Sequence, residues 1–132
     1  SARSAGDLRV ALVDERDQRL AISNPLRVVP NSSHRHYWGD FHAQSEETIG
    51  TNTARDYFLF ARDRAFSDFV GHQGNDFQIT TEFWDELNGL CREFNAPGRF
   101  VTMPGYEYSP VTALGGDRNI YFFDEGQPIR RS

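Results

Sequence analysis

The sequence has 132 residues, enough for one domain with a short appendage. Nineteen acidic residues stand against fourteen arginines and no lysine, giving a formal net charge of −5. Surfaces that bind nucleic acids or anionic membranes need clustered positive charge, so we expect neither partner. No run of about 18 apolar residues is present, so we expect no membrane segment. The single cysteine, Cys91, has no partner for an internal disulfide.

The first part of the chain has the pattern of a β-hairpin. Apolar residues alternate with polar or small ones along 8–12, and the alternation resumes at 20–22 after a polar turn at 14–18. A hairpin of this kind is barely stable alone. We therefore interpret residues 1–29 as the tail of a preceding β-domain and residues 30–36 as a linker.

From Tyr37 onward the pattern changes to alternating strands and helices, typical of an α/β fold. The predicted order is β-α-β-α-β-β, which indicates a mainly parallel sheet with right-handed crossovers. The strands are expected at 37–42, 66–72, 99–107 and 119–123.

Two amphipathic segments predict the helices between these strands. The first begins after Thr53, a helix-capping residue with Asp56 three positions on, and its apolar face is Ala54, Phe58, Ala61 and Ala65. The second is expected over 81–94, with the apolar residues Phe83, Trp84, Leu87, Leu90, Cys91 and Phe94 at helical spacing. Asn95, followed by Pro97 and Gly98, is its stop signal.

Residues with metal-binding side chains stand at the ends of three predicted strands. His42 ends the first, His72 the second and Glu107 the third. Functional groups in parallel α/β folds collect where strands end, so these side chains are expected to converge. Imidazole and carboxylate ligands suit Zn²⁺, Mn²⁺ or Fe²⁺. Gln44 shares a strand face with His42, and its neutral amide makes it a weak candidate ligand.

Several other groups have competing interpretations. Asn75 and Asp76 orient a ligand or only shape the turn after His72, and Arg118 contacts a phosphate or pairs with Asp40 or Asp117. His34 and His36 lie in the linker, and a pair of solvated histidines is a simpler interpretation there than a metal site. Cys91 belongs to the apolar face of the second helix, and Ser45 has no adjacent base to make it a nucleophile.

The segment from Tyr37 to Arg131 resembles the polymerase-and-histidinol-phosphatase (PHP) superfamily, and within it a bacterial branch catalogued as a domain of unknown function. "YWGD-x-H-x-QS" and "GGDRN" segments recur in that branch. The motifs that carry the resemblance are Gly39-Asp40-Phe41-His42-Ala43-Gln44-Ser45, the strand-end His72 and Pro104-Gly105-Tyr106-Glu107.

The resemblance implies that residues 37–132 are the first part of a distorted seven-stranded β/α barrel that holds one to three divalent metal ions and hydrolyses phosphoesters. By position, His42 matches the first His of the superfamily's His-x-His motif, and Gln44 replaces the second. His72 and Glu107 match the ligands after the second and third strands. Glu46 or Glu47 is the candidate for the ligand that usually follows the first motif, at an altered spacing. Arg118 or Asn119 occupies the region of the fourth strand where another His is common.

The superfamily's remaining ligands follow later strands, so we expect an incomplete chain that is inactive alone. The remainder of its own chain, or another copy, is expected to cover the open sheet.

Two functions of different classes follow from these observations. The first is a metal-dependent hydrolase of phosphoester type, in which a metal-activated water attacks a small anionic substrate. The groups expected to support its ligands or contact its substrate are Asp40, Glu47, Asn75, Asp76, Arg118 and Asn119. The alternative is a degenerate, non-catalytic barrel that serves as a binding or cell-surface module, favoured by the substitution at Gln44. A structural scaffold that needs no metal is harder to reconcile with metal-binding side chains at the ends of three strands.

Overall fold

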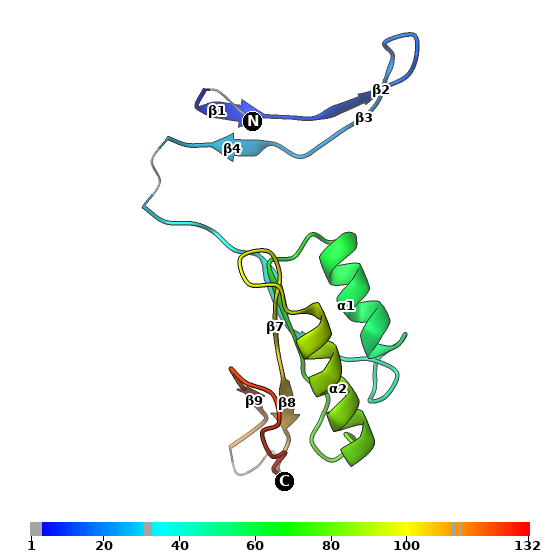
Figure 1. Ribbon diagram of the computed structural model, residues 1–132, viewed down its shortest axis with the longest axis vertical. Coiled ribbons are helices and arrows are strands. Elements are labelled where there is room, and N and C mark those ends of the chain that lie inside the picture. The colour runs from blue at the N-terminus through cyan, green and yellow to red at the C-terminus, as the bar shows by residue number, and fades with distance from the viewer. Residues whose placement is uncertain (1–3, 31–32, 112, 114) are drawn as a thin grey trace. The chain divides into compact units, whose positions relative to one another are not determined.

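The computed structural model describes residues 4–30, 33–111, 113 and 115–132. The chain divides into two compact units, Ser1–His36 and Tyr37–Ser132, whose elements are labelled in Figure 1. Within the described residues, no helix is both long and apolar enough to cross a membrane.

The first unit is a ribbon of two antiparallel strand pairs. β1 (Gly6–Leu8) pairs with β4 (Leu26–Val28), and β2 (Ala11–Val13) pairs with β3 (Arg19–Ile22). Leu8 lies opposite Leu26, and the neighbouring Asp7 forms an ion pair with Arg27. None of this unit's described residues is buried, so they form no core of their own. That the ribbon is the tail of a preceding β-domain stays a prediction.

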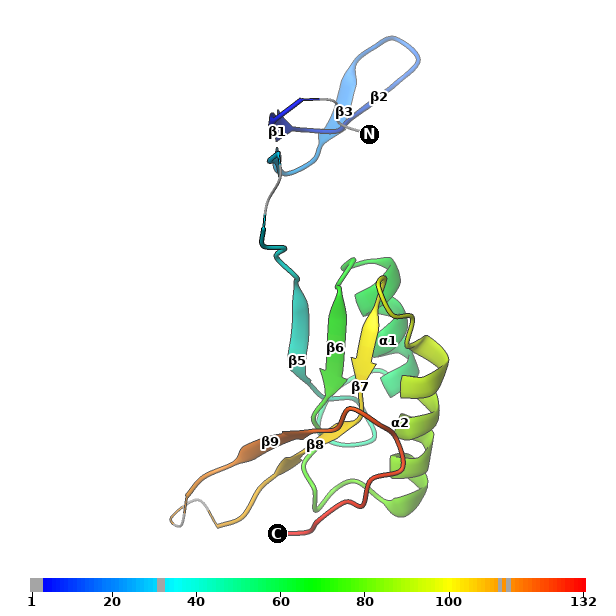
Figure 2. The same ribbon diagram turned by 60° about the vertical axis from the view of Figure 1, so that its left-hand side comes forward.

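The second unit is built on a three-stranded parallel sheet. Its order is β5 (Gly39–Ala43), β6 (Phe69–His72) and β7 (Val101–Met103). α1 (Ala54–Asp63) connects β5 to β6, and α2 (Thr81–Phe94) connects β6 to β7. Figure 2 shows both helices on the same face of the sheet. The predicted α/β class is confirmed, and the structure builds it from small sheets and two helices.

Capping side chains set where both helices begin. The Thr53 hydroxyl accepts a hydrogen bond from the Asp56 backbone N–H, and the Thr80 hydroxyl accepts one from that of Phe83. Each bond satisfies a donor that has no partner within its helix. α2 has the predicted bounds. α1 ends at Asp63, so Ala65, expected on its apolar face, lies beyond the helix and is exposed.

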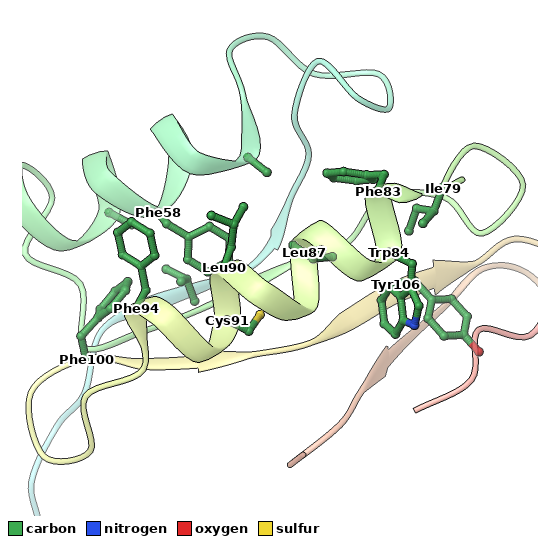
Figure 3. Packing of buried hydrophobic residues seen from close by; sticks show 13 residues of the cluster. Phe58, Ile79, Phe83, Trp84, Leu87, Leu90, Cys91, Phe94, Phe100 and Tyr106 are labelled. Carbon is green, nitrogen blue, oxygen red and sulfur yellow. The ribbon is translucent and has the colours of Figure 1, made fainter. Parts of the chain in front are cut away.

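The core lies between the helices and the sheet, as Figure 3 shows. Phe58 of α1 stacks obliquely on Phe94 of α2, with ring centroids 5.5 Å apart. At the other end of α2, the Trp84 ring meets Tyr106 edge to face at 5.8 Å. The buried apolar residues are Ala54, Phe58, Ala61, Val70, Ile79, Phe83, Trp84, Leu87, Leu90, Cys91, Phe94, Phe100 and Tyr106.

The predicted strand at 99–107 is in fact two strands that belong to different sheets. β7 ends at Met103, and β8 (Gly105–Tyr108) pairs with β9 (Arg118–Tyr121) in an antiparallel hairpin. Pro104 separates them, because it has no N–H to continue a ladder. The prediction that the fourth strand extends the parallel sheet is therefore wrong. The described residues form no closed barrel.

The segment after β9 returns across α2. The Gly126 N–H donates to the Asn88 side chain at 2.8 Å, and the indole N–H of Trp84 donates to the Gln127 carbonyl at 2.9 Å. These bonds hold the β8–β9 hairpin at the carboxyl end of the sheet, where the candidate site lies.

Candidate functional site

An extra residue in β5 decides where His42 points. Asp40 is paired with Val70 of β6, whereas Ala43, three residues on, is paired with His72, two residues on. β5 therefore holds one more residue than β6 between these pairs, as in a β-bulge. Without it, His42 would lie beside His72 and share its face. With it, His42 turns away from the helices, and its side chain is 52% exposed.

The His42 ring is oriented by an amide and points at a carboxylate. Its Nδ1 lies 3.1 Å from Oδ1 of Asn119 in β9, and its Nε2 lies 3.7 Å from Oε2 of Glu107 in β8. Asn119 and Glu107 are directly paired across the β8–β9 hairpin, so they share one face of it. The amide oxygen of Asn119 only accepts hydrogen bonds, so Nδ1–H of His42 donates to it, and in the neutral ring the lone pair is on Nε2.

Glu107 is fixed through its backbone and its side chain. Its N–H donates to the Gly74 carbonyl, and its own carbonyl accepts from the Asp76 N–H, so the loop after β6 is held against β8. Its side chain is only 11% exposed, and Oε2 accepts from the Asn75 amide at 3.1 Å. The carboxylate that faces His42 is therefore held in place before any ligand arrives.

A chain of amide groups leads from Glu107 back to β5. The Asn75 amide also donates to the Ser109 hydroxyl at 2.8 Å, and its carbonyl oxygen accepts from the Gln44 amide at 3.2 Å. The Gln44 carbonyl in turn accepts from the Thr48 hydroxyl at 3.0 Å. Gln44 thus orients Asn75, and both ends of its amide take part in hydrogen bonds.

His72 is part of the core. It is fully buried, its ring meets that of Phe83 edge to face at 5.4 Å, and burial lowers its pKa to about 4 against a small opposing effect of Glu47. The Gly74 N–H donates to Nδ1, so the proton is on Nε2, which donates to the Ser45 hydroxyl at 2.7 Å. With both nitrogens in hydrogen bonds, His72 offers no free lone pair to a metal. Since Nε2 is the donor, it is also no base for Ser45.

The other predicted groups have mainly structural contacts. Asp40 accepts from the His42 backbone N–H, and the carboxylate of Glu47 accepts from that of Ala54 at the start of α1. The carboxylate of Asp76, fully buried, accepts the N–H groups of Ser109 and Ser132.

Three further expectations concern residues away from the pair. Arg118 precedes Asn119 in β9, so strand alternation puts its side chain on the opposite face of the hairpin from His42. Burial raises the pKa of the Cys91 thiol to about 12, which fits a packing role. In the linker, Nδ1 of His34 lies 2.9 Å from the Ser33 hydroxyl, and His36 is exposed.

The arrangement brings together His42 and Glu107 but not His72. A metal ion about 2.1 Å from each ligand atom fits between Nε2 and Oε2. Two ligands do not complete a site, and the described part of the chain holds no group of three or more His, Cys, Asp or Glu residues that could bind a metal.

Two contacts at the site could not be predicted from the sequence, because each joins residues that are distant along the chain. One is the hydrogen bond between Ser45 and His72, and the other is that between Asn75 and Ser109. Only the hydrogen bonds of the folded structure reveal them.

Comparison with known proteins gives one family and three relatives. A family model described as "Protein of unknown function (DUF3604)" matches residues 19–131. An uncharacterized protein of Chlamydia pneumoniae is 26% identical over 117 residues, which is 87% of this chain and 19% of that protein. Uncharacterized proteins of Chlamydia muridarum and Chlamydia trachomatis are each 22% identical over 122 residues, 91% of this chain and 20% of theirs. No solved structure matches significantly.

The chain thus spans about a fifth of the length of these relatives. That it carries a domain of unknown function is confirmed, but its placement in the PHP superfamily is wrong, because the family model that matches is a different one and no relative supports the PHP assignment. The model covers most of the sequence, so the chain belongs to the DUF3604 family.

Proposed function

We propose that this chain contributes His42 and Glu107 to the divalent-metal site of a hydrolase of phosphoester type. The remaining ligands would come from other parts of a longer polypeptide, as the length of the relatives allows. Zinc, manganese or iron suits the two ligand types.

One observation carries the proposal: Nε2 of His42 faces Oε2 of Glu107 at 3.7 Å. In the neutral His42 ring, whose Nδ1–H donates to Asn119, Nε2 bears a lone pair, and Oε2 belongs to a carboxylate. Two such atoms repel unless a cation lies between them. A divalent metal or a proton would relieve the repulsion, and the amide-held orientation of both groups is typical of metal ligands.

Each residue around the pair has a distinct role in this proposal. Asn119 selects the His42 tautomer with a free Nε2, and Asn75 holds the Glu107 carboxylate at the opening. The bound metal would lower the pKa of a water to produce a nucleophile near neutral pH. The groups around His42 and Glu107 that could hydrogen-bond a small anionic substrate are amides and carry no charge. The metal would therefore supply the positive charge that balances the substrate.

The test is metal binding by the full-length protein. We expect titration calorimetry to show uptake of zinc or manganese, a loss of about 10–100-fold in affinity or more in His42→Ala and Glu107→Gln, and hydrolysis of p-nitrophenyl phosphate that falls with it. His36→Ala is the matched control, since it removes an exposed imidazole from the linker and should leave both properties unchanged.

Unaltered metal affinity in His42→Ala would contradict the proposed ligand. An intact protein that takes up no metal would leave the proton as the cation between the pair and would remove the hydrolase proposal.

The second candidate is a non-catalytic binding module. The observation that favours it is that the described residues hold no group of three or more His, Cys, Asp or Glu residues that could bind a metal, and that Gln44 supplies only an amide. Metal uptake without hydrolysis of any phosphoester would support this candidate.

A further inference from the structure

The two faces of the parallel sheet are covered very differently. Val70 and His72 of β6 point to the helices and are fully buried. Between them, Gly71 points to the opposite face, where a side chain in its place would meet the rings of Tyr121 and Phe41 at 3.2 and 3.6 Å. Beyond Tyr121, no described element of the second unit covers this face in Figure 2.

The uncovered face is apolar and continuous across all three strands. Phe69 of β6 is paired with Val101 of β7, and Gly71 with Met103, so these side chains share the face by register. The Phe41 and Phe69 rings are 4.3 Å apart, and Tyr121 joins them through a ring contact of 5.1 Å and a hydrogen bond from its hydroxyl to the Phe41 carbonyl.

A groove of about 410 Å³ runs over this face, lined by Tyr37, Phe41, Asp68, Phe69, Gly98, Arg99, Val101 and Met103. Tyr37, Phe41 and Val101 are 62%, 40% and 38% exposed. Parallel sheets are found with both faces covered, because their strands are apolar on both sides. An open apolar surface of this kind marks a place where something packs.

We infer that another part of the same longer polypeptide packs its apolar side chains on this face as a second covering layer. The relatives matched here contain about four-fifths of their length outside the aligned region, which is ample material for such a layer. Apolar burial at about 25 cal/mol per Å² makes a face of large rings a strong attachment site. The inference does not depend on whether a metal binds between His42 and Glu107.

Hydroxyl-radical footprinting of the native full-length protein tests the inference without any mutation. Met103 is the single methionine of this sequence, and it reacts readily, so it reports on the face directly, with Phe41 and Phe69 as further probes. We expect labelling at least about tenfold slower than in the urea-unfolded protein, as for core side chains such as Phe58.

Two outcomes would overturn the inference. Labelling of Met103 as fast as in the unfolded protein would show that the face stays open. Protection that disappears on dilution would show that a second copy covers it instead. Protection that is independent of protein concentration supports a covering layer from the same polypeptide.

Discussion

Protonation of His72 should destabilise the fold as the pH falls below 6.5. In the native state its Nδ1 accepts the Gly74 N–H, and no solvent reaches the ring. If Nδ1 were protonated, its N–H would face the Gly74 N–H, and these two buried donors would have no acceptor between them. Burial accordingly lowers the pKa of His72 from 6.5 to about 4. Between these values the unfolded chain binds a proton that the native chain does not, so stability is complete above 6.5 and is lost toward pH 4.

The size of the effect follows from the two pKa values. A shift from 6.5 to about 4 corresponds to about 3 kcal/mol over the whole window, of which about 2 kcal/mol is lost between pH 7 and pH 5. Stopping at pH 5 keeps the measurement above the range in which carboxylates with lowered pKa values, such as that of Glu93 beside Arg55, take up protons.

Urea denaturation of the 132-residue chain at pH 7, 6 and 5 measures this loss. His72→Gln should lower stability at pH 7, because it disturbs the contacts to Gly74 and Ser45, but it should remove most of the pH dependence. His36→Ala should retain the wild-type slope. If His72→Gln loses as much stability toward pH 5 as the wild type does, the reasoning about the buried neutral imidazole is refuted.

Three further predictions concern the helices and the site. Leu87→Ala, in the core of α2, should cost about 2–5 kcal/mol in urea denaturation, whereas Leu59→Ala on the outer side of α1 should cost clearly less. Thr53→Ala removes the α1 cap and should cost about 1 kcal/mol by the same measurement, with Thr51→Ala as the exposed control; equal effects would argue against the cap. Asn75→Ala in the full-length protein should weaken metal binding about 10–100-fold in calorimetry, and unchanged affinity would show that Glu107 needs no such support.

Much of the α/β core could be predicted because its signals are local. Thr53 and Thr80 cap the helices through contacts three residues away, and the spacing of Phe83, Leu87 and Leu90 is a property of one helix. The split at Pro104 could not be placed in this way. Residues 99–107 read as one strand with its core at 100–103, and only the pairing of β8 with β9 shows that the chain changes sheets within this segment.

The candidate site depends on a pairing that the sequence does not show. Strand ends were expected to bring His42 and His72 to one place, and in a regular parallel ladder they would be neighbours on one face. The extra residue between Asp40 and Ala43 moves His42 by one position, and a shift of one position changes the face on which a strand side chain lies. The same shift gives the two histidines different roles. His72 is neutral and buried in the core, whereas His42 is directed at Glu107 by Asn119. A bulge that re-aims one side chain toward a carboxylate is a feature to expect beside a functional site, and it makes His42, rather than His72, the residue whose loss should affect function before it affects folding.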